Sequence, residues 1–112
     1  MSHGARKRAL DADVTDCLND VFDPEVGLSV VDLGLVYRAD READEIDVDL
    51  TLTTRACPLG EMIAEDARER LADRFPDAQR ITVSLVWSPP WSPDMITDRG
   101  RELLGRKAKD AA

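Results

Sequence analysis

Alternating apolar and polar positions along the chain predict three β-strands. The clearest is 46–53, where every second residue is aliphatic and the residues between are aspartate or threonine, as expected of a strand with one buried and one polar face. Residues 80–87 show a similar alternation. The run 33–38 is rich in aliphatic residues and contains Gly34, which predicts a strand with a bulge or a close backbone contact. The charged stretch 39–45 is predicted to be a hairpin loop.

Apolar residues at helical spacing, together with start and stop signals, predict helices at 8–22, 58–75 and 97–105. The first should end before the Asp-Pro step that follows it, because proline disfavours a helical residue before it. In the third, Thr97 can cap the first turn and Gly105 should end the helix. The apolar faces of the first two helices are predicted to be Leu10, Val14, Cys17, Leu18 and Val21, and Leu59, Met62, Ile63, Ala67, Leu71 and Phe75.

The predicted elements follow the order α-β-β-α-β-α, without an internal repeat or linker. The first two strands should form an antiparallel hairpin, and the last two should run parallel because a helix connects them. We therefore predict an α+β fold, a small two-layer α/β sandwich whose mixed three-stranded sheet carries helices mainly on one face. A single domain is expected over 8–105, with flexible tails at 1–7 and 106–112.

Composition narrows the class of protein. The net charge of −8 over 112 residues repels phosphates, so we expect no nucleic-acid partner. No apolar run approaches the length of a membrane span, and the basic N-terminus lacks the apolar segment of a secretory signal, so a cytoplasmic protein is expected. His3 is the sole histidine and the two cysteines lack metal-ligand spacing, which argues against a Cys–His catalytic pair and a self-contained zinc site.

Cys57 is the first candidate for chemistry. It directly precedes Pro58, which suits the first turn of the second predicted helix. Unpaired backbone N–H groups and the helix dipole favour a thiolate there, and Arg55 adds positive potential. A small residue in a tight strand-to-helix turn is an equally good interpretation of the residues alone. Cys17, on the apolar face of the first helix, is expected to be a core residue.

Several polar residues accompany Cys57. Thr51, Thr53 and Thr54 bring hydroxyl groups to the end of the strand that leads to it, where they can orient a thiolate or a ligand oxygen, although threonine is also ordinary in a strand. Asp32 interrupts an apolar run. It can pair with Arg55, accept backbone hydrogen bonds or help to bind a metal, and a role in a turn is at least as good an interpretation.

Both tryptophans, Trp87 and Trp91, lie in a proline-rich segment. Tryptophan is enriched in protein interfaces, and proline keeps the entropic cost of ordering low. The segment is thus predicted either to bind a partner or to close one end of the core as a hydrophobic flap, and the two roles are compatible.

Three stretches together resemble a known family. DPEVGLSVVDLGLVY (23–37), LTLTTRACPLGEMI (50–63) and VSLVWSPPWSPDMI (83–96) are similar to motifs of the small metal–sulfur cluster assembly proteins. That family includes the bacterial SufT proteins, the eukaryotic cytosolic cluster-targeting subunits and the N-terminal part of PaaD. The resemblance covers about residues 10–105, and it is specific because the three motifs occur in the family's order and spacing.

The resemblance implies a role in maturing iron–sulfur proteins, without enzymatic activity, and a two-layer α/β fold. It implies that Cys57 is the reactive cysteine, that Asp32 is the family's Asp-Leu-Gly aspartate, and that Thr51 and Thr53 are its threonines. Ala56 stands where many relatives have glycine. The chain lacks the cysteine-rich extension of PaaD-like proteins, which favours a SufT-like role.

We hypothesise that Cys57 is a transient ligand of iron or of an iron–sulfur cluster, with no tightly bound cofactor. A cluster normally takes four ligands, so the others would come from a second subunit or a partner. Expected partners are iron–sulfur apoproteins, the assembly machinery and a second copy in a homodimer. One alternative is an adaptor without metal contact that binds through Trp87 and Trp91, and a more distant one is a thiol enzyme using Cys57.

Overall fold

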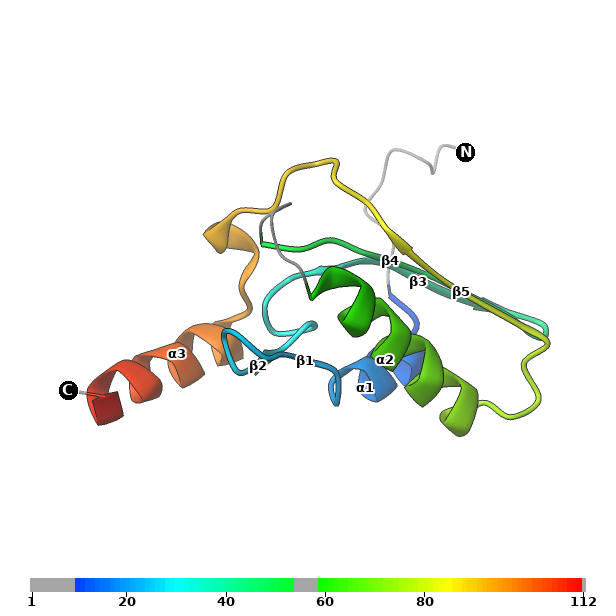
Figure 1. The fold of residues 1–112 in the computed structure, drawn as a ribbon, viewed down its shortest axis with the longest axis horizontal. Coiled ribbons are helices and arrows are strands. Elements are labelled where there is room, and N and C mark those ends of the chain that lie inside the picture. The colour runs from blue at the N-terminus through cyan, green and yellow to red at the C-terminus, as the bar shows by residue number, and fades with distance from the viewer. Residues whose placement is uncertain (1–9, 54–58, 112) are drawn as a thin grey trace.

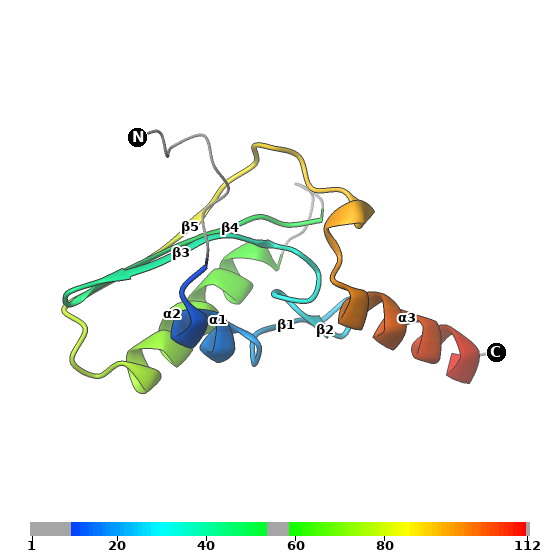
Figure 2. The ribbon, with the colours of Figure 1, turned by 180° about the vertical axis from the view of Figure 1, so that it is seen from behind.

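The computed structural model describes residues 10–53 and 59–111, with side chains described as far as residue 105. A three-stranded sheet forms one layer, and two helices cover one of its faces while a third helix extends from one end (Figures 1 and 2). The elements in order are α1 (Ala12–Leu18), β1 (Phe22–Asp23), β2 (Leu28–Ser29), β3 (Val36–Glu42), β4 (Glu45–Leu50), α2 (Gly60–Arg74), β5 (Arg80–Leu85), the 3-10 turn η1 (Pro93–Met95) and α3 (Asp98–Ala111).

The sheet has the predicted mixed topology. Its strand order is β3-β4-β5, with β3 antiparallel to β4 and β4 parallel to β5. Helix α2 makes the crossover between the two parallel strands, as a parallel connection requires. The α+β class, the order of helices and main strands, and the placement of α1 and α2 on one face are thereby confirmed.

Alternation along β4 determines which face is buried. Ile46, Val48 and Leu50 are at most 1% exposed, and they point toward α1 and α2. Asp47 and Asp49, on the other face, remain half-buried. Val14, Leu18, Ile63, Ala67 and Leu71 complete the core from the helices. The apolar layer between helices and sheet thus supplies the main hydrophobic stabilisation.

The first long strand begins later than predicted. It spans Val36–Glu42 instead of 33–38, and the hairpin loop expected at 39–45 shrinks to a two-residue turn at Ala43 and Asp44. Charged residues continue the strand because its polar face is open to water, while Ala39 is 1% exposed on the inner face. The predicted close backbone contact at Gly34 is present, but it lies in a turn before the strand.

The first helix is shorter than predicted. It covers Ala12–Leu18 instead of 8–22, because the Asp11 carboxylate caps it by accepting a hydrogen bond from the Val14 N–H at 2.9 Å. At the other end, Val21 leaves the helix and its carbonyl accepts from the Val30 N–H at 2.9 Å. This contact belongs to the β1–β2 hairpin, which the sequence did not predict because each strand has two residues.

Other element ends also differ from prediction. Strand β4 ends at Leu50 instead of 53, β5 ends at Leu85 instead of 87, and α2 covers Gly60–Arg74 instead of 58–75. Helix α3 continues through Gly105 to Ala111, so the predicted end at Gly105 is wrong. A glycine lowers helix propensity by about 1 kcal/mol but ends a helix only where it takes a left-handed conformation.

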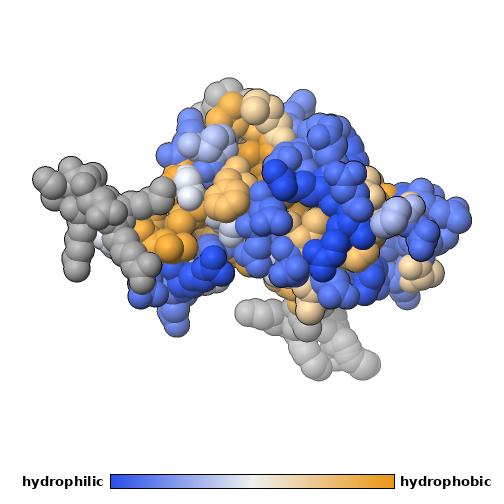
Figure 3. All heavy atoms as spheres, turned by 90° about the horizontal axis from the view of Figure 1, so that it is seen from below, coloured by the Kyte–Doolittle hydropathy of each residue, from blue (hydrophilic) through white to orange (hydrophobic). Residues whose placement is uncertain are grey.

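Two apolar residues assigned to helix faces are exposed. Leu10 is 36% exposed before α1 begins, and Met62 is 62% exposed on the outer side of α2. Met62 and Phe22, itself 52% exposed, line a surface cavity of about 320 Å³. Figure 3 views the helix-bearing side and shows apolar residues in separate patches among polar ones. The apolar face predicted for α2 therefore wrongly included Met62.

Candidate functional site

Asp32 lies in a turn between β2 and β3. Its own N–H donates to the Ser29 hydroxyl at 3.0 Å, and the Leu33 N–H donates to the Ser29 carbonyl at 3.0 Å. Gly34 follows with a φ of +76°, a conformation that side-chain-bearing residues rarely adopt. A Cβ placed on Gly34 would lie 2.1 Å from the Met95 carbonyl oxygen, so the glycine allows the C-terminal segment to approach.

The C-terminal segment holds this turn in place. The Thr97 hydroxyl donates to the Asp32 carboxylate at 3.0 Å, and the Thr97 N–H donates to the Asp32 carbonyl at 2.9 Å. Arg99 places its Nε 3.6 Å from the other carboxylate oxygen. The Thr97 hydroxyl also accepts from the Gly100 N–H at 2.9 Å, which confirms Thr97 as the cap of α3.

Asp32 is 6% exposed, and its described partners are Thr97 and Arg99. The turn role considered for it therefore has direct support. Arg55, the partner that the sequence suggested, lies outside the described residues.

Trp91 forms a further hydrogen bond to the turn that contains Asp32. Its indole Nε1–H donates to the Leu33 carbonyl at 2.7 Å. Trp87 and Trp91 are both half-buried and pack against the core, which agrees with the predicted hydrophobic flap. Their predicted part in binding a partner stays a prediction. We call the 29–35 turn, together with the contacts from Trp91, Met95 and Thr97, the clamp.

Tyr37, which was not among the functional residues predicted from the sequence, links β3 to the clamp. Its hydroxyl donates to the Pro89 carbonyl at 2.8 Å and lies 3.4 Å from the Met95 Sδ. Burial raises the pKa of the phenol, and the neighbouring Thr51 hydroxyl opposes that shift. Tyr37 is the one tyrosine of the sequence and stands among charged strand residues, a signal that could have drawn attention to it.

Thr51 is the most unusual polar residue of the described chain. It is 1% exposed, and its hydroxyl lies beside that of Tyr37 but makes no hydrogen bond of ordinary geometry in the part that the structure describes. A buried hydroxyl without a partner costs free energy, so such groups often mark a functional site or a water position. Thr53 is half-buried, and Thr54 lies outside the described residues.

Cys57, the main candidate from the sequence, also lies outside the described residues. Leu52 and Gly60, which lie on either side of the 54–58 segment, are described and are in contact with each other. A Cβ placed on Gly60 would lie 2.5 Å from the Leu52 Cδ1 and 3.6 Å from the Leu85 Cδ1. The start of α2 therefore packs tightly on the ends of β4 and β5, with its positive dipole end at the carboxyl end of the sheet.

Cys17 behaves as the predicted core residue. It is 5% exposed, and its thiol donates a weak hydrogen bond to the Arg70 carbonyl at 3.4 Å. Burial is the main cause that raises the pKa of this thiol, which disfavours the thiolate needed for ligation or attack. Within residues 10–53 and 59–105, no group of three His, Cys, Asp or Glu side chains is arranged to hold a metal.

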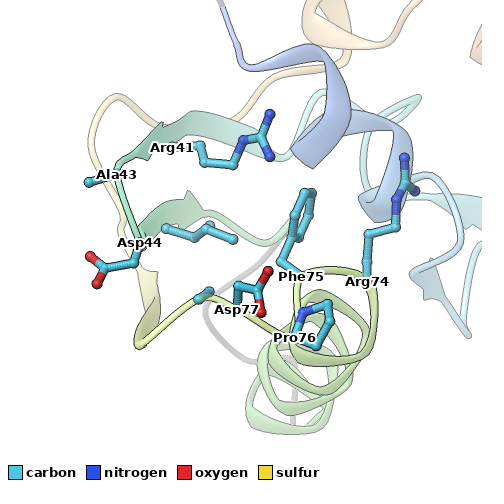
Figure 4. Close-up of a pocket in the computed structure, with 9 residues that line it drawn as sticks. Arg41, Ala43, Asp44, Arg74, Phe75, Pro76 and Asp77 are labelled. Carbon is cyan, nitrogen blue, oxygen red and sulfur yellow. The ribbon is translucent and has the colours of Figure 1, made fainter.

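A cavity of about 240 Å³ lies at the opposite end of the sheet, beside the β3–β4 turn (Figure 4). The Phe75 ring there lies between two guanidinium groups, with its centroid 4.9 Å from the Arg41 Cζ and 5.7 Å from the Arg74 Cζ. Arg41 pairs with Asp13 at 2.9 Å. None of the residues predicted from the sequence to be functional lines this cavity, and its arginines pair with acids from α1, so it joins elements of the fold.

No helix in the described ranges combines the length and apolar character needed to cross a bilayer.

Comparison with known proteins connects the site to a family. The family model described as iron–sulfur cluster assembly protein matches residues 11–85. The chain is 36% identical to the Fe-S protein maturation auxiliary factor YitW of Bacillus subtilis, covering 88% of this chain and 97% of that protein. It is 41% identical to the Fe-S protein maturation auxiliary factor SufT of Staphylococcus aureus, covering 76% and 97%.

A solved structure agrees with the fold as well. The crystal structure of a domain of unknown function, DUF59, from Bacillus anthracis superposes with a TM-score of 0.78 at 33% identity, covering 83% of this chain and 89% of that one. The family model, the relatives that match over nearly their whole length and the fold therefore agree on the same family. The chain therefore belongs to the iron–sulfur cluster assembly protein family.

Proposed function

We propose that this chain is an auxiliary factor that helps to mature iron–sulfur proteins in the cytoplasm. The observation that carries the proposal is its similarity, over most of both chains, to two proteins named as Fe-S protein maturation auxiliary factors. The cluster is cargo in this role, and the chain itself performs no catalysis. A reducing cytoplasm suits the function because it keeps Cys57 a free thiol.

Cys57 is the proposed ligand of the cargo. It lies between the end of β4 and the start of α2 in the sequence, and those two ends are in contact through Leu52 and Gly60. The positive end of the 15-residue helix α2 favours a nearby thiolate. Cys17, buried with a raised pKa, is not available for the same task, so the chain offers one thiolate.

One thiolate makes a weak site, which suits delivery. Clusters normally have four protein ligands, so a site with fewer ligands releases its cargo by ligand exchange. The proposed remaining ligands come from the recipient apoprotein, the assembly machinery or a second copy in a homodimer. Thr51, with its unpartnered buried hydroxyl, is the described residue most suited to donate a hydrogen bond to cargo or to a thiolate there. Thr53 and Thr54 are proposed to assist.

Asp32 and the tryptophans act indirectly in this proposal. Asp32 holds Thr97 at 3.0 Å and so keeps the clamp closed beside the end of the sheet. Trp87 and Trp91 are half-buried and retain exposed surface, which supports a secondary role in contacting apoproteins. A purely adaptor function through these tryptophans is the competing proposal.

The test is complementation of a strain lacking the gene, with aconitase activity as the readout at matched soluble protein levels. Wild type should restore aconitase, Cys57→Ser should not, and Cys17→Ala serves as the matched cysteine control that should restore it. Full restoration by Cys57→Ser together with failure of Trp91→Ala would replace the ligand proposal by the adaptor one. Failure of wild type to restore any iron–sulfur enzyme would reject the maturation role.

A further inference from the structure

The outer edge of β5 is an open strand edge. In the sheet order β3-β4-β5, β5 pairs with β4 on one side, and no strand of the described chain pairs with its other side. The Arg80 and Val86 N–H groups donate to the Asp44 and Leu50 carbonyls at 3.3 and 2.8 Å. Because backbone direction alternates along a strand, the N–H and C=O groups of Ile81, Val83 and Leu85 point outward.

The two edges of the sheet are built differently. On the β3 edge, the Asp11 N–H donates to the Ala39 carbonyl at 2.8 Å, the register shifts between Val36 and Arg38, and charged residues follow. These are the usual devices that prevent a strand from pairing with another chain. Residues 81–87 of the β5 edge contain no charge and no proline, so this edge lacks such protection.

The apolar layer is also unfinished at β5. Ile46, Val48 and Leu50 of β4 are at most 1% exposed, whereas their register neighbours on β5 are half-buried. Beside Val83 and Leu85, a groove of about 280 Å³ runs along α2. Figure 1 shows α2 and β5 on the side toward the viewer, with α1 and β3 on the far side that Figure 2 faces.

We infer that the β5 edge pairs antiparallel with the β5 edge of a second copy of this chain, around a two-fold axis at Val83. In that register Val83 faces the partner's Val83, and Ile81 faces the partner's Leu85. These outward-pointing residues exchange both backbone hydrogen bonds. Between them, Thr82 faces the partner's Ser84 on the open face of the sheet. The strand is thus complementary to itself in backbone and in side-chain character.

The charged residues that line the groove also favour a second copy of this chain as the partner. The groove is lined by Glu61 and Glu65 on one stretch of α2 and by Arg68 further along, and Arg68 forms an exposed ion pair with Glu65. A two-fold axis sets the two α2 helices antiparallel above the joined sheet. Gly60 packs on Leu85, and a helix rises about 1.5 Å per residue against about 3.3 Å for a strand, so Val83 lies roughly level with position 64 of α2. Glu61 of one helix then lies roughly level with Arg68 of the other, which has the opposite charge.

This pairing also bears on the source of the cluster ligands. Only that part of the inference rests on the proposed function. The start of α2 packs on Leu85 at the end of β5, so antiparallel pairing places the two α2 starts at opposite ends of the joined strands. Cys57 precedes Leu59 by two residues in the sequence. A second copy paired in this way is therefore not the source of the additional cluster ligands, and of the three proposed sources the recipient and the assembly machinery remain.

Sedimentation velocity of the full chain tests the interface directly. A six-residue strand and a short groove make a small interface, so we expect a dimer that dissociates at roughly micromolar concentrations. Combining Thr82→Lys with Ser84→Lys places lysine opposite lysine and should weaken dimerisation about tenfold or more. Combining Thr82→Lys with Ser84→Glu places opposite charges across the same two positions and should preserve it.

Circular dichroism and the Tm confirm that each variant is folded before it is compared. A wild type that stays monomeric at all concentrations, or a dimer that the double-lysine variant leaves intact, would overturn the inference. Equal loss of dimer in both double variants would overturn the two-fold register. If wild type is monomeric and the double-lysine variant has lower maturation activity than wild type, the β5 edge would instead bind an extended segment of a partner protein. Aconitase complementation is scored separately, so a failed interface leaves the maturation proposal standing.

Discussion

At one end of the sheet the chain is held by hydrogen bonds to buried residues, and at the other by exposed ion pairs. In the clamp, Asp32 is 6% exposed and receives the Thr97 hydroxyl, while Trp91 donates to the Leu33 carbonyl. At the opposite end, Arg41 and Arg74 flank Phe75 and pair with aspartates of α1. Both arginines are about two-fifths exposed.

This contrast indicates where the stability of the fold depends on single residues. An exposed ion pair contributes about 0 to 1 kcal/mol, because water competes for both charges. A buried polar group left without its partner costs about 1 to 3 kcal/mol. The clamp, which lies at the same end of the sheet as the start of α2, should therefore be sensitive to change, whereas the ion-paired end should tolerate it.

Gly34→Ala should have the largest effect. The φ of +76° disfavours alanine, and the new Cβ would stand 2.1 Å from the Met95 carbonyl oxygen, a backbone atom that must move. We expect the free energy of unfolding to fall by about 3 kcal/mol or more, measured by urea denaturation. Gly105→Ala is the matched control: it has open space at Cβ and should raise that free energy by about 1 kcal/mol. Equal effects of the two variants would contradict the close approach.

Asp32→Ala should lower the free energy of unfolding by about 2 kcal/mol, because it removes the acceptor of the Thr97 hydroxyl and the partner of Arg99. Asp32→Asn keeps an acceptor oxygen and should lose less. Chemical denaturation measures both variants, and aconitase complementation measures function. A maturation defect in Asp32→Asn at unchanged stability would show that the charge acts on cargo and would contradict a purely structural role.

Thr51→Val should change stability in the other direction. The hydroxyl is buried without a hydrogen-bond partner in the described chain, so an isosteric methyl should raise the free energy of unfolding by up to about 1 kcal/mol. We expect maturation activity to fall in the same variant, because the hydroxyl is proposed to serve cargo. A loss of stability in urea denaturation would instead reveal a hidden partner of the hydroxyl.

Arg74→Ala should have the smallest effect. It removes an exposed contact with Asp16 at 3.2 Å and one cation–π contact with Phe75. We expect a loss of about 0.5 kcal/mol, which shrinks further at high salt. Thermal unfolding at low and high salt measures it. A loss as large as that of Asp32→Ala would remove the proposed contrast between the two ends.

The sequence predicted the sheet well because its signal is periodic. Ile46, Val48 and Leu50 alternate with polar residues and are buried as expected. The helical connection to β5 was sufficient to predict the parallel pair. The β1–β2 hairpin was missed because two-residue strands carry no period, and β3 was misplaced because its charged residues resemble a loop.

The candidate site was predictable only in part. Asp32 and Trp91 attracted attention as an acid in an apolar run and an aromatic among prolines. Their actual partners, Thr97 and Leu33, are distant in sequence, and local patterns hold no information on such contacts. The buried state of Thr51 could not be predicted either, because alternation assigned it to the polar face and its neighbour Tyr37 comes from another strand.

The most direct test of the maturation role is transfer of a cluster in vitro. The full chain is reconstituted with iron and sulfide under anaerobic conditions and mixed with apo-aconitase, and aconitase activity is followed. We expect wild type and Cys17→Ala to activate aconitase at similar rates, whereas Cys57→Ser should neither take up a cluster nor activate the enzyme. Equal uptake and activation by Cys57→Ser would contradict the claim that this thiolate carries the cargo.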